Sequence, residues 1–136
     1  MAPTCVLIPA AERRAYTGKQ ALSYFEGISA QSAGSRGLCL NLLTLPPGAS
    51  AKPHLHQNHE TAVYVLSGTV EHRYGEALEE RMVLHAGDFL YIPPGVPHAP
   101  ANVSQTEPCL ALIARTDPNE QESVVLRPDL EAALAP

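Results

Sequence analysis

Three histidines and a glutamate crowd into one short segment, Pro53–Glu60, which reads Pro-His-Leu-His-Gln-Asn-His-Glu. Residues two apart on a β-strand share a face, so His54 and His56 can converge on one ion through metal–nitrogen bonds of about 2.0–2.1 Å. Neutral imidazole with a carboxylate suits Zn, Fe, Mn, Ni or Cu and disfavours Ca and Mg. The segment therefore predicts one divalent transition metal, with His59 or Glu60 as a further ligand.

A fourth histidine of interest follows a proline-glycine turn further along the chain. Residues Gly87–Asn102 combine an apolar run, the turn Pro93-Pro94-Gly95, and then His98. Such a turn reverses the chain, and it can place His98 on a strand beside the first cluster. We therefore expect His98 to face His54 and His56.

Short strands separated by proline and glycine turns must position these side chains. Alternating or β-branched runs predict strands at Thr4–Ile8, Leu22–Phe25, Leu38–Leu45, Thr61–Leu66, Thr69–Tyr74, Glu79–Leu84, Phe89–Ile92, Leu110–Arg115 and Ser123–Leu126. Loops are expected at Ala10–Ala21, with one turn of helix, and at Ser29–Gly37, and a short helix at Asp129–Leu134. Short strands at this spacing indicate an all-β sandwich or barrel.

The composition narrows the class of protein further. The chain has 136 residues, enough for one domain, and its 13 prolines leave little room for long helices. A net charge of −5 argues against a nucleic-acid-binding surface. The three widely spaced cysteines form no disulfide framework. The N-terminal residues lack the pattern of a signal peptide, and no apolar run is long enough to span a bilayer. A cytoplasmic protein without membrane contact is expected.

The two histidine segments resemble the motifs of the cupin superfamily. The first motif, G-x5-H-x-H-x(3,4)-E-x6-G, is matched by Gly48, His54, His56, Glu60 and Gly68. The second, G-x5-P-x-G-x2-H-x3-N, is matched by Gly87, Pro93, Gly95, His98 and Asn102. The resemblance implies a cupin jelly-roll β-barrel of two antiparallel sheets with an interior metal. It also implies a cupin core at 38–127, N-terminal strands and loops at 1–37 that complete or swap onto the barrel, a C-terminal tail or short helix at 128–136, and a homodimer.

The first motif departs from the cupin pattern at one point. Seven residues, rather than six, separate Glu60 from Gly68, so Thr61 stands six residues before that glycine. A regular strand would put His59 on the face of Thr61 and turn Glu60 away, whereas a bulge would return Glu60 to the site. The predicted metal ligands are therefore His54, His56 and His98, with either Glu60 or His59. The second set resembles the zinc-containing cupin polyketide cyclases.

Other side chains are secondary candidates. Glu60, if it is not a ligand, is a candidate general base, and Tyr64 is a candidate phenol donor. His72 is expected to be a surface residue of a strand, and His85 a surface residue of a turn. Arg73 and Arg115 could meet an anionic substrate, but the favoured interpretation of both is a strand-surface charge.

These features predict a metal-dependent enzyme that acts on a small organic molecule. Two chemistries stay open: Lewis-acid catalysis of an isomerisation, decarboxylation or cyclisation, and dioxygen activation. The alternative is a non-catalytic module that binds a small molecule or a metal, because a fold alone does not determine function.

Overall fold

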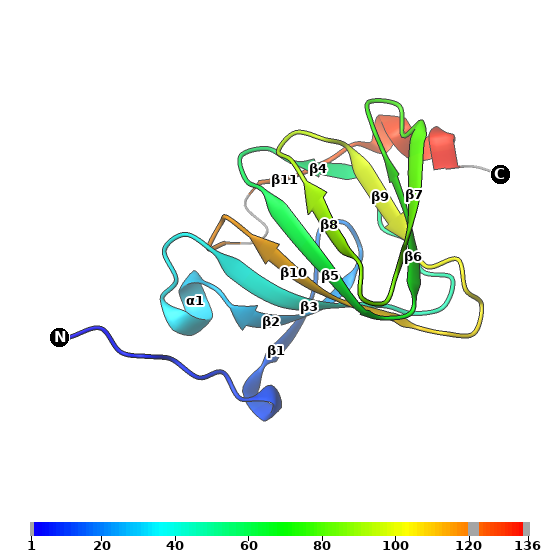
Figure 1. Cartoon of the computed structure of the whole chain (residues 1–136). Coiled ribbons are helices and arrows are strands. Elements are labelled where there is room, and N and C mark those ends of the chain that lie inside the picture. Colours follow the sequence, from blue (N-terminus) through cyan, green and yellow to red (C-terminus); the bar gives the residue numbers. More distant parts are fainter. Residues whose placement is uncertain (1, 120–122, 135–136) are drawn as a thin grey trace.

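Two antiparallel sheets make up the molecule in a computed structural model that describes residues 2–119 and 123–134 (Figure 1). One sheet has six strands in the order β1-β2-β3-β10-β5-β8. Their bounds are Arg14–Thr17, Ser23–Ile28, Cys39–Leu45, Cys109–Arg115, Thr61–Ser67 and Phe89–Ile92. The second sheet has five strands in the order β11-β4-β9-β6-β7. Their bounds are Val124–Leu126, His54–His56, His98–Ala101, Thr69–Tyr74 and Glu80–His85.

Helices are short within the described ranges. A 3-10 turn η1 (Ala10–Glu12) precedes β1, and η2 (Pro128–Leu134) ends the described chain. The helix α1 (Ala30–Ala33) begins at a capping box, in which Ser29 and Ser32 bond each other's backbone N–H, and it ends at Gly34 in the left-handed conformation. None of these helices is long and apolar enough to cross a bilayer.

The core lies between the two sheets because alternate residues of the central strands point inward. In β10 the inward set is Cys109, Ala111, Ile113 and Arg115, and all four are buried. The neighbouring strand β5 runs into β6 through Gly68, whose φ is 82°. A Cβ atom there would collide with the carbonyl oxygen of Pro108, so only glycine fits this turn.

The predicted all-β, two-sheet architecture is confirmed, with corrections at the N-terminal end. The segment Thr4–Ile8 is not a strand: it runs outside both sheets, and Leu7 is exposed. Instead β1 and β2 form the edge of the six-stranded sheet, with β2 paired to β3. Apolar character alone suggested a strand at Thr4–Ile8, but Pro3 and Pro9 lack the N–H groups that a ladder needs. The two sheets are not joined by strand pairing in the described parts of the chain.

Candidate metal centre

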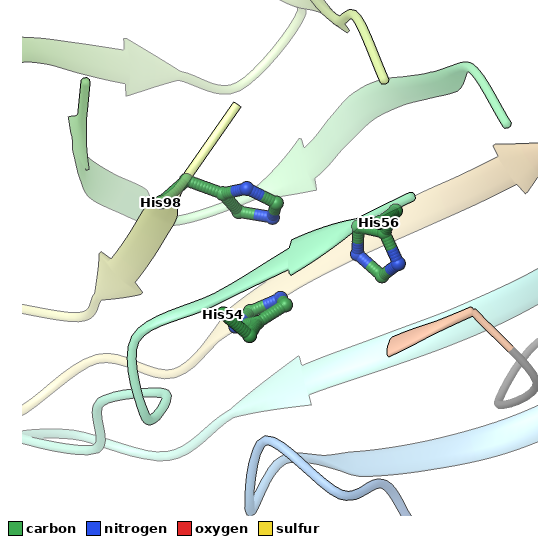
Figure 2. A group of neighbouring side chains, drawn as sticks. All are labelled: His54, His56 and His98. Carbon is green, nitrogen blue, oxygen red and sulfur yellow. The ribbon is translucent and has the colours of Figure 1, made fainter. Parts of the chain in front are cut away.

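Three histidines come together where β4 meets β9. His54 and His56 lie on β4, and His98 lies directly opposite His54 in the antiparallel pairing with β9. One ring nitrogen from each lies within 4.8 Å of the others, and all three side chains are buried. Their rings face a common space between the two strands (Figure 2). The spacing of two residues on β4 and the turn before His98 produce this convergence, as the sequence predicts.

Backbone carbonyls orient two of the rings. The Nδ1 atom of His54 lies 2.7 Å from the carbonyl oxygen of Lys52, and Nδ1 of His98 lies 2.9 Å from that of Val96. A carbonyl can only accept a hydrogen bond, so Nδ1 carries the proton in both rings. The Nε2 atom of each neutral ring is then left with a free lone pair. In histidines that bind a metal through one ring nitrogen, the other ring nitrogen typically donates a hydrogen bond of this kind.

Burial keeps the histidines uncharged, as metal ligands must be. It lowers the pKa of His54 to about 4, and the nearby Arg115 charge adds to the effect. Burial likewise lowers the pKa of His98 far below its ordinary value, with further repulsion from neighbouring imidazoles. The pKa of His56 is also lowered, first by burial and then by the charge of Arg115. Both ring nitrogens of His56 are buried without a hydrogen-bond partner among the described residues.

His59 points inward, beside His56. Its ring lies 4.7 Å from that of His56, centroid to centroid, and it is buried. Nδ1 of His59 lies 2.6 Å from Oγ of Ser123 and 3.3 Å from Oδ2 of Asp117, whereas Nε2 is buried without a partner in the described ranges. His59 lies next to, rather than inside, the group of three whose nitrogens are all within 4.8 Å.

Glu60 points to the outside of the molecule. Its side chain is exposed, and its Oε1 accepts a hydrogen bond of 2.8 Å from the hydroxyl of Tyr91. The strand β5 begins at Thr61, which is buried at the position where the cupin pattern has its glutamate. This is the regular-strand arrangement of the two that the spacing left open, with Thr61 inside and Glu60 outside.

An interior cavity adjoins the histidines, and its lining includes two residues that were expected at the surface. The expectation for His72 is wrong: it is buried at 4% exposure, and its ring lies 5.4 Å from that of His98. Burial lowers the pKa of His72 to about 4. The expectation for Arg115 is also wrong, because it is only 5% exposed and lines the same cavity. His72 lies two positions after the buried Val70 on β6, and Arg115 lies two positions after the buried Ile113 on β10. Each therefore shares the inner face of its strand.

The remaining candidates lie away from the cavity. Tyr64 is on the outer face of β5, where its ring packs against the exposed Phe89, with 4.7 Å between the centroids and a tilt of 48° between the ring planes. His85 is exposed, as expected, and Arg73 donates hydrogen bonds to the carbonyl of Leu78. Glu60 and Tyr64 are both absent from the cavity lining.

The described residues fit a transition metal. Three converging, buried and neutral imidazoles present donor atoms, and nitrogens of His56 and His59 have no other partner in the described chain. Buried polar atoms are normally hydrogen-bonded, so ring nitrogens without a protein partner in the described chain are suited to bind a metal. Imidazole nitrogen suits Zn, Cu, Fe and Ni.

A sandwich of antiparallel sheets with inward-facing imidazoles defines a class of small β-proteins with an interior metal site. The sequence model of the cupin domain matches residues 41–114, more than half of the chain. The chain therefore belongs to the cupin family. A sequence comparison with curated proteins finds no match.

Solved structures share this fold at low sequence identity. A double-stranded β-helix protein from Klebsiella pneumoniae subsp. pneumoniae MGH 78578 is 19% identical with a TM-score of 0.66, over 82% of this chain and 88% of its own. Oxalate decarboxylase from Bacillus subtilis is 20% identical with a TM-score of 0.75, over 99% of this chain and 35% of its own. Oxalate oxidase in complex with glycolate is 20% identical with a TM-score of 0.66, over 82% of this chain and 59% of its own. The likeness is one of fold, and the chain spans about a third of the decarboxylase.

Proposed function

We propose that this cupin is a metal-dependent enzyme that acts on a small organic molecule in its interior cavity. The observation that carries the proposal is the convergence of the buried His54, His56 and His98. Two of them, His54 and His98, line the cavity, and the ring nitrogens of His56 have no hydrogen-bond partner among the described residues. His54, His56 and His98 would hold the metal, and His59 is proposed as the fourth ligand. A surface histidine cluster would instead be solvated and would titrate near its ordinary pKa.

The choice of His59 over Glu60 rests on where the two side chains point. His59 is buried, and its Nε2 has no hydrogen-bond partner among the residues that the structure describes, while Ser123 and Asp117 hold its other nitrogen. Glu60 is exposed and bonded to Tyr91. To reach the histidines, Glu60 would have to take the inward position of the buried Thr61, which requires a bulge or a one-residue slip at the start of β5. The same outward position argues against Glu60 as a general base, and the contact of Tyr64 with Phe89, outside the cavity lining, argues against Tyr64 as a proton donor.

A four-imidazole donor set favours Lewis-acid chemistry over dioxygen activation. When bound, such a metal polarises a carbonyl or enolate oxygen, as an isomerisation, decarboxylation or cyclisation requires. Non-haem iron oxygenases commonly use two histidines and a carboxylate, and the described donor set contains no carboxylate. The chain's own contribution is an apolar cavity that excludes water, together with the neutral ring of His72, which offers one donor and one acceptor.

The structural neighbours leave the reaction class open. One is a decarboxylase and another an oxidase, and both are named for oxalate. The preference for Lewis-acid chemistry therefore comes from the donor set of this chain. Self-association into a homodimer also stays a prediction, for light scattering to test.

The experiment combines elemental analysis with two activity measurements. The purified protein is assayed for metal per chain, then for dioxygen uptake and for turnover of small carbonyl compounds, before and after chelation. We expect about one Zn or Ni per chain and turnover that chelation abolishes without dioxygen uptake. Bound iron with dioxygen uptake would replace Lewis-acid chemistry with oxygenase chemistry. Tight metal with no turnover that responds to chelation would favour the non-catalytic module, and absence of metal would refute the proposed site.

A further inference from the structure

Arg115 is a buried cation that forms no ion pair with any of the residues that the structure describes. It lies at the end of β10, opposite Thr61 of β5, and its side chain lines the cavity with His54 and His98. Its Nε and Nη1 atoms are both buried without a hydrogen-bond partner among the described residues. Leaving a buried guanidinium unpaired is costly, and buried arginines normally form ion pairs.

The surroundings of Arg115 make the cavity a place for an anion. No aspartate or glutamate lines it in the described ranges. Besides Arg115, the lining residues with a polar group are His54, His72, His98, Thr61, Cys109 and Tyr24, whose hydroxyl accepts a hydrogen bond from Gln20. A divalent metal on neutral imidazoles would add further positive charge nearby. Two acidic residues next to these strands in the sequence have other partners: Asp117 lies beside the Nδ1 of His59, and Glu60 bonds Tyr91 on the outside.

Thr61 supplies a second polar group that lacks a partner. It pairs directly with Arg115 across the two strands, so both side chains leave the sheet on the same, inner face. The hydroxyl oxygen of Thr61 is buried, lines the cavity and has no hydrogen-bond partner in the described chain. An arginine fork with an adjacent hydroxyl can donate three hydrogen bonds to the two oxygens of a carboxylate.

We propose that Arg115 and Thr61 form the subsite that binds the carboxylate of the substrate. The inference rests on the proposed function, since it names the substrate class of the same cavity. The remaining lining is apolar, with side chains such as Val63, Ile92 and Ile113. The cavity volume of about 50 Å³ holds roughly four water-sized groups, at about 10–15 Å³ each. The substrate is therefore a small carboxylic acid with a short apolar body.

The test is a binding titration with propionate and its neutral analogue propionamide. Binding is followed by NMR through the side-chain Nε–H resonance of Arg115, in the metal-free and in the zinc-loaded protein. We expect propionate to shift this resonance and to bind at least tenfold more tightly than propionamide. Equal binding of the two probes, or a propionate titration that leaves Arg115 unmoved in both forms, would overturn the proposal.

Variants of Arg115 distinguish binding of the carboxylate charge from packing of the ligand's apolar body. Arg115→Met should weaken propionate binding at least tenfold without changing the affinity for propionamide, and Arg115→Lys should retain part of the preference. The control is Arg81→Met, which removes an exposed arginine paired with Glu71 and should leave both affinities unchanged. If Arg115→Met fails to fold, the wild-type titration still decides the question.

Metal content is measured in every sample, so this proposal and the proposed function can fail separately. Propionate bound at Arg115 in a protein that takes up no zinc would support the carboxylate subsite and refute the metal site. One zinc bound per chain, without any preference for propionate over propionamide, would support the metal site and refute the carboxylate subsite.

Discussion

Replacing Arg115 with methionine should make the metal-free protein more stable. Arg115 is 5% exposed, and two of its guanidinium nitrogens, Nε and Nη1, have no hydrogen-bond partner in the described chain. Each unsatisfied buried donor costs about 1–3 kcal/mol, and more when it is charged. Methionine removes that cost and, as a flexible apolar side chain, fills most of the space among the apolar cavity residues. We expect the free energy of unfolding to rise by about 1–4 kcal/mol, the range seen when buried charges are replaced by apolar residues.

Urea and thermal unfolding, followed by circular dichroism with a chelator present, measure this change. The Tm should rise by several degrees, at about 3–6 °C per kcal/mol for a chain of this size. Arg81→Met provides the baseline, because its exposed ion pair with Glu71 contributes at most about 1 kcal/mol. A loss of more than about 1 kcal/mol in Arg115→Met, beyond the baseline, would refute the reasoning. Such a loss would show that Arg115 stabilises the fold in the absence of a ligand.

Three further predictions concern the buried polar groups. The pKa values of His54 and His72 are lowered from 6.5 to about 4, so between those pH values only the unfolded chain binds the protons. Urea titrations of the metal-free protein should therefore show stability falling as pH drops from 6.5 to 4, by about 2–3 kcal/mol per pH unit from these two rings. Asn102→Ala removes an amide that bonds three backbone carbonyls. Chemical unfolding should show a loss of about 2–4 kcal/mol, and a loss below about 1 would contradict this role. Ser123→Ala removes the hydroxyl 2.6 Å from Nδ1 of His59. Chelator competition should show metal affinity about 10–100-fold weaker, and unchanged affinity would exclude His59 as an oriented ligand.

Local patterns were sufficient to predict most of the fold. Proline-glycine turns and alternating runs located β3, β5, β6 and β8, with bounds within two residues of those observed. The N-terminal end was mispredicted because Thr4–Ile8 is apolar but flanked by prolines, whereas β1, with the sequence Arg-Ala-Tyr-Thr, has no distinct strand pattern. Pairing with β2 stabilises that segment, and such tertiary pairing overrides local propensity.

The histidine convergence was predictable from spacing, whereas the cationic side of the cavity was not. The two-residue period on β4 and the turn before His98 suffice to bring three imidazoles together. Arg115 ends a nearly continuous apolar run, so the sequence does not show which face of the strand points inward. The burial of Arg115 could therefore not be predicted. The seven-residue spacing between Glu60 and Gly68 indicated that Thr61 could take the inward position. Only the observed start of β5 at Thr61 distinguishes this regular strand from a bulge.

Metal affinity in the pair of variants His59→Ala and Glu60→Gln tests the central claim most directly. The two residues are adjacent in sequence, but one ring is buried beside His56 and the other side chain bonds Tyr91 on the outside. Competition with a chromophoric chelator gives the zinc affinity of each variant and of the wild type. A four-histidine centre predicts that Glu60→Gln stays within about twofold of wild type while His59→Ala loses at least about tenfold, as expected for a lost ligand. Full affinity in His59→Ala together with a large loss in Glu60→Gln would contradict it.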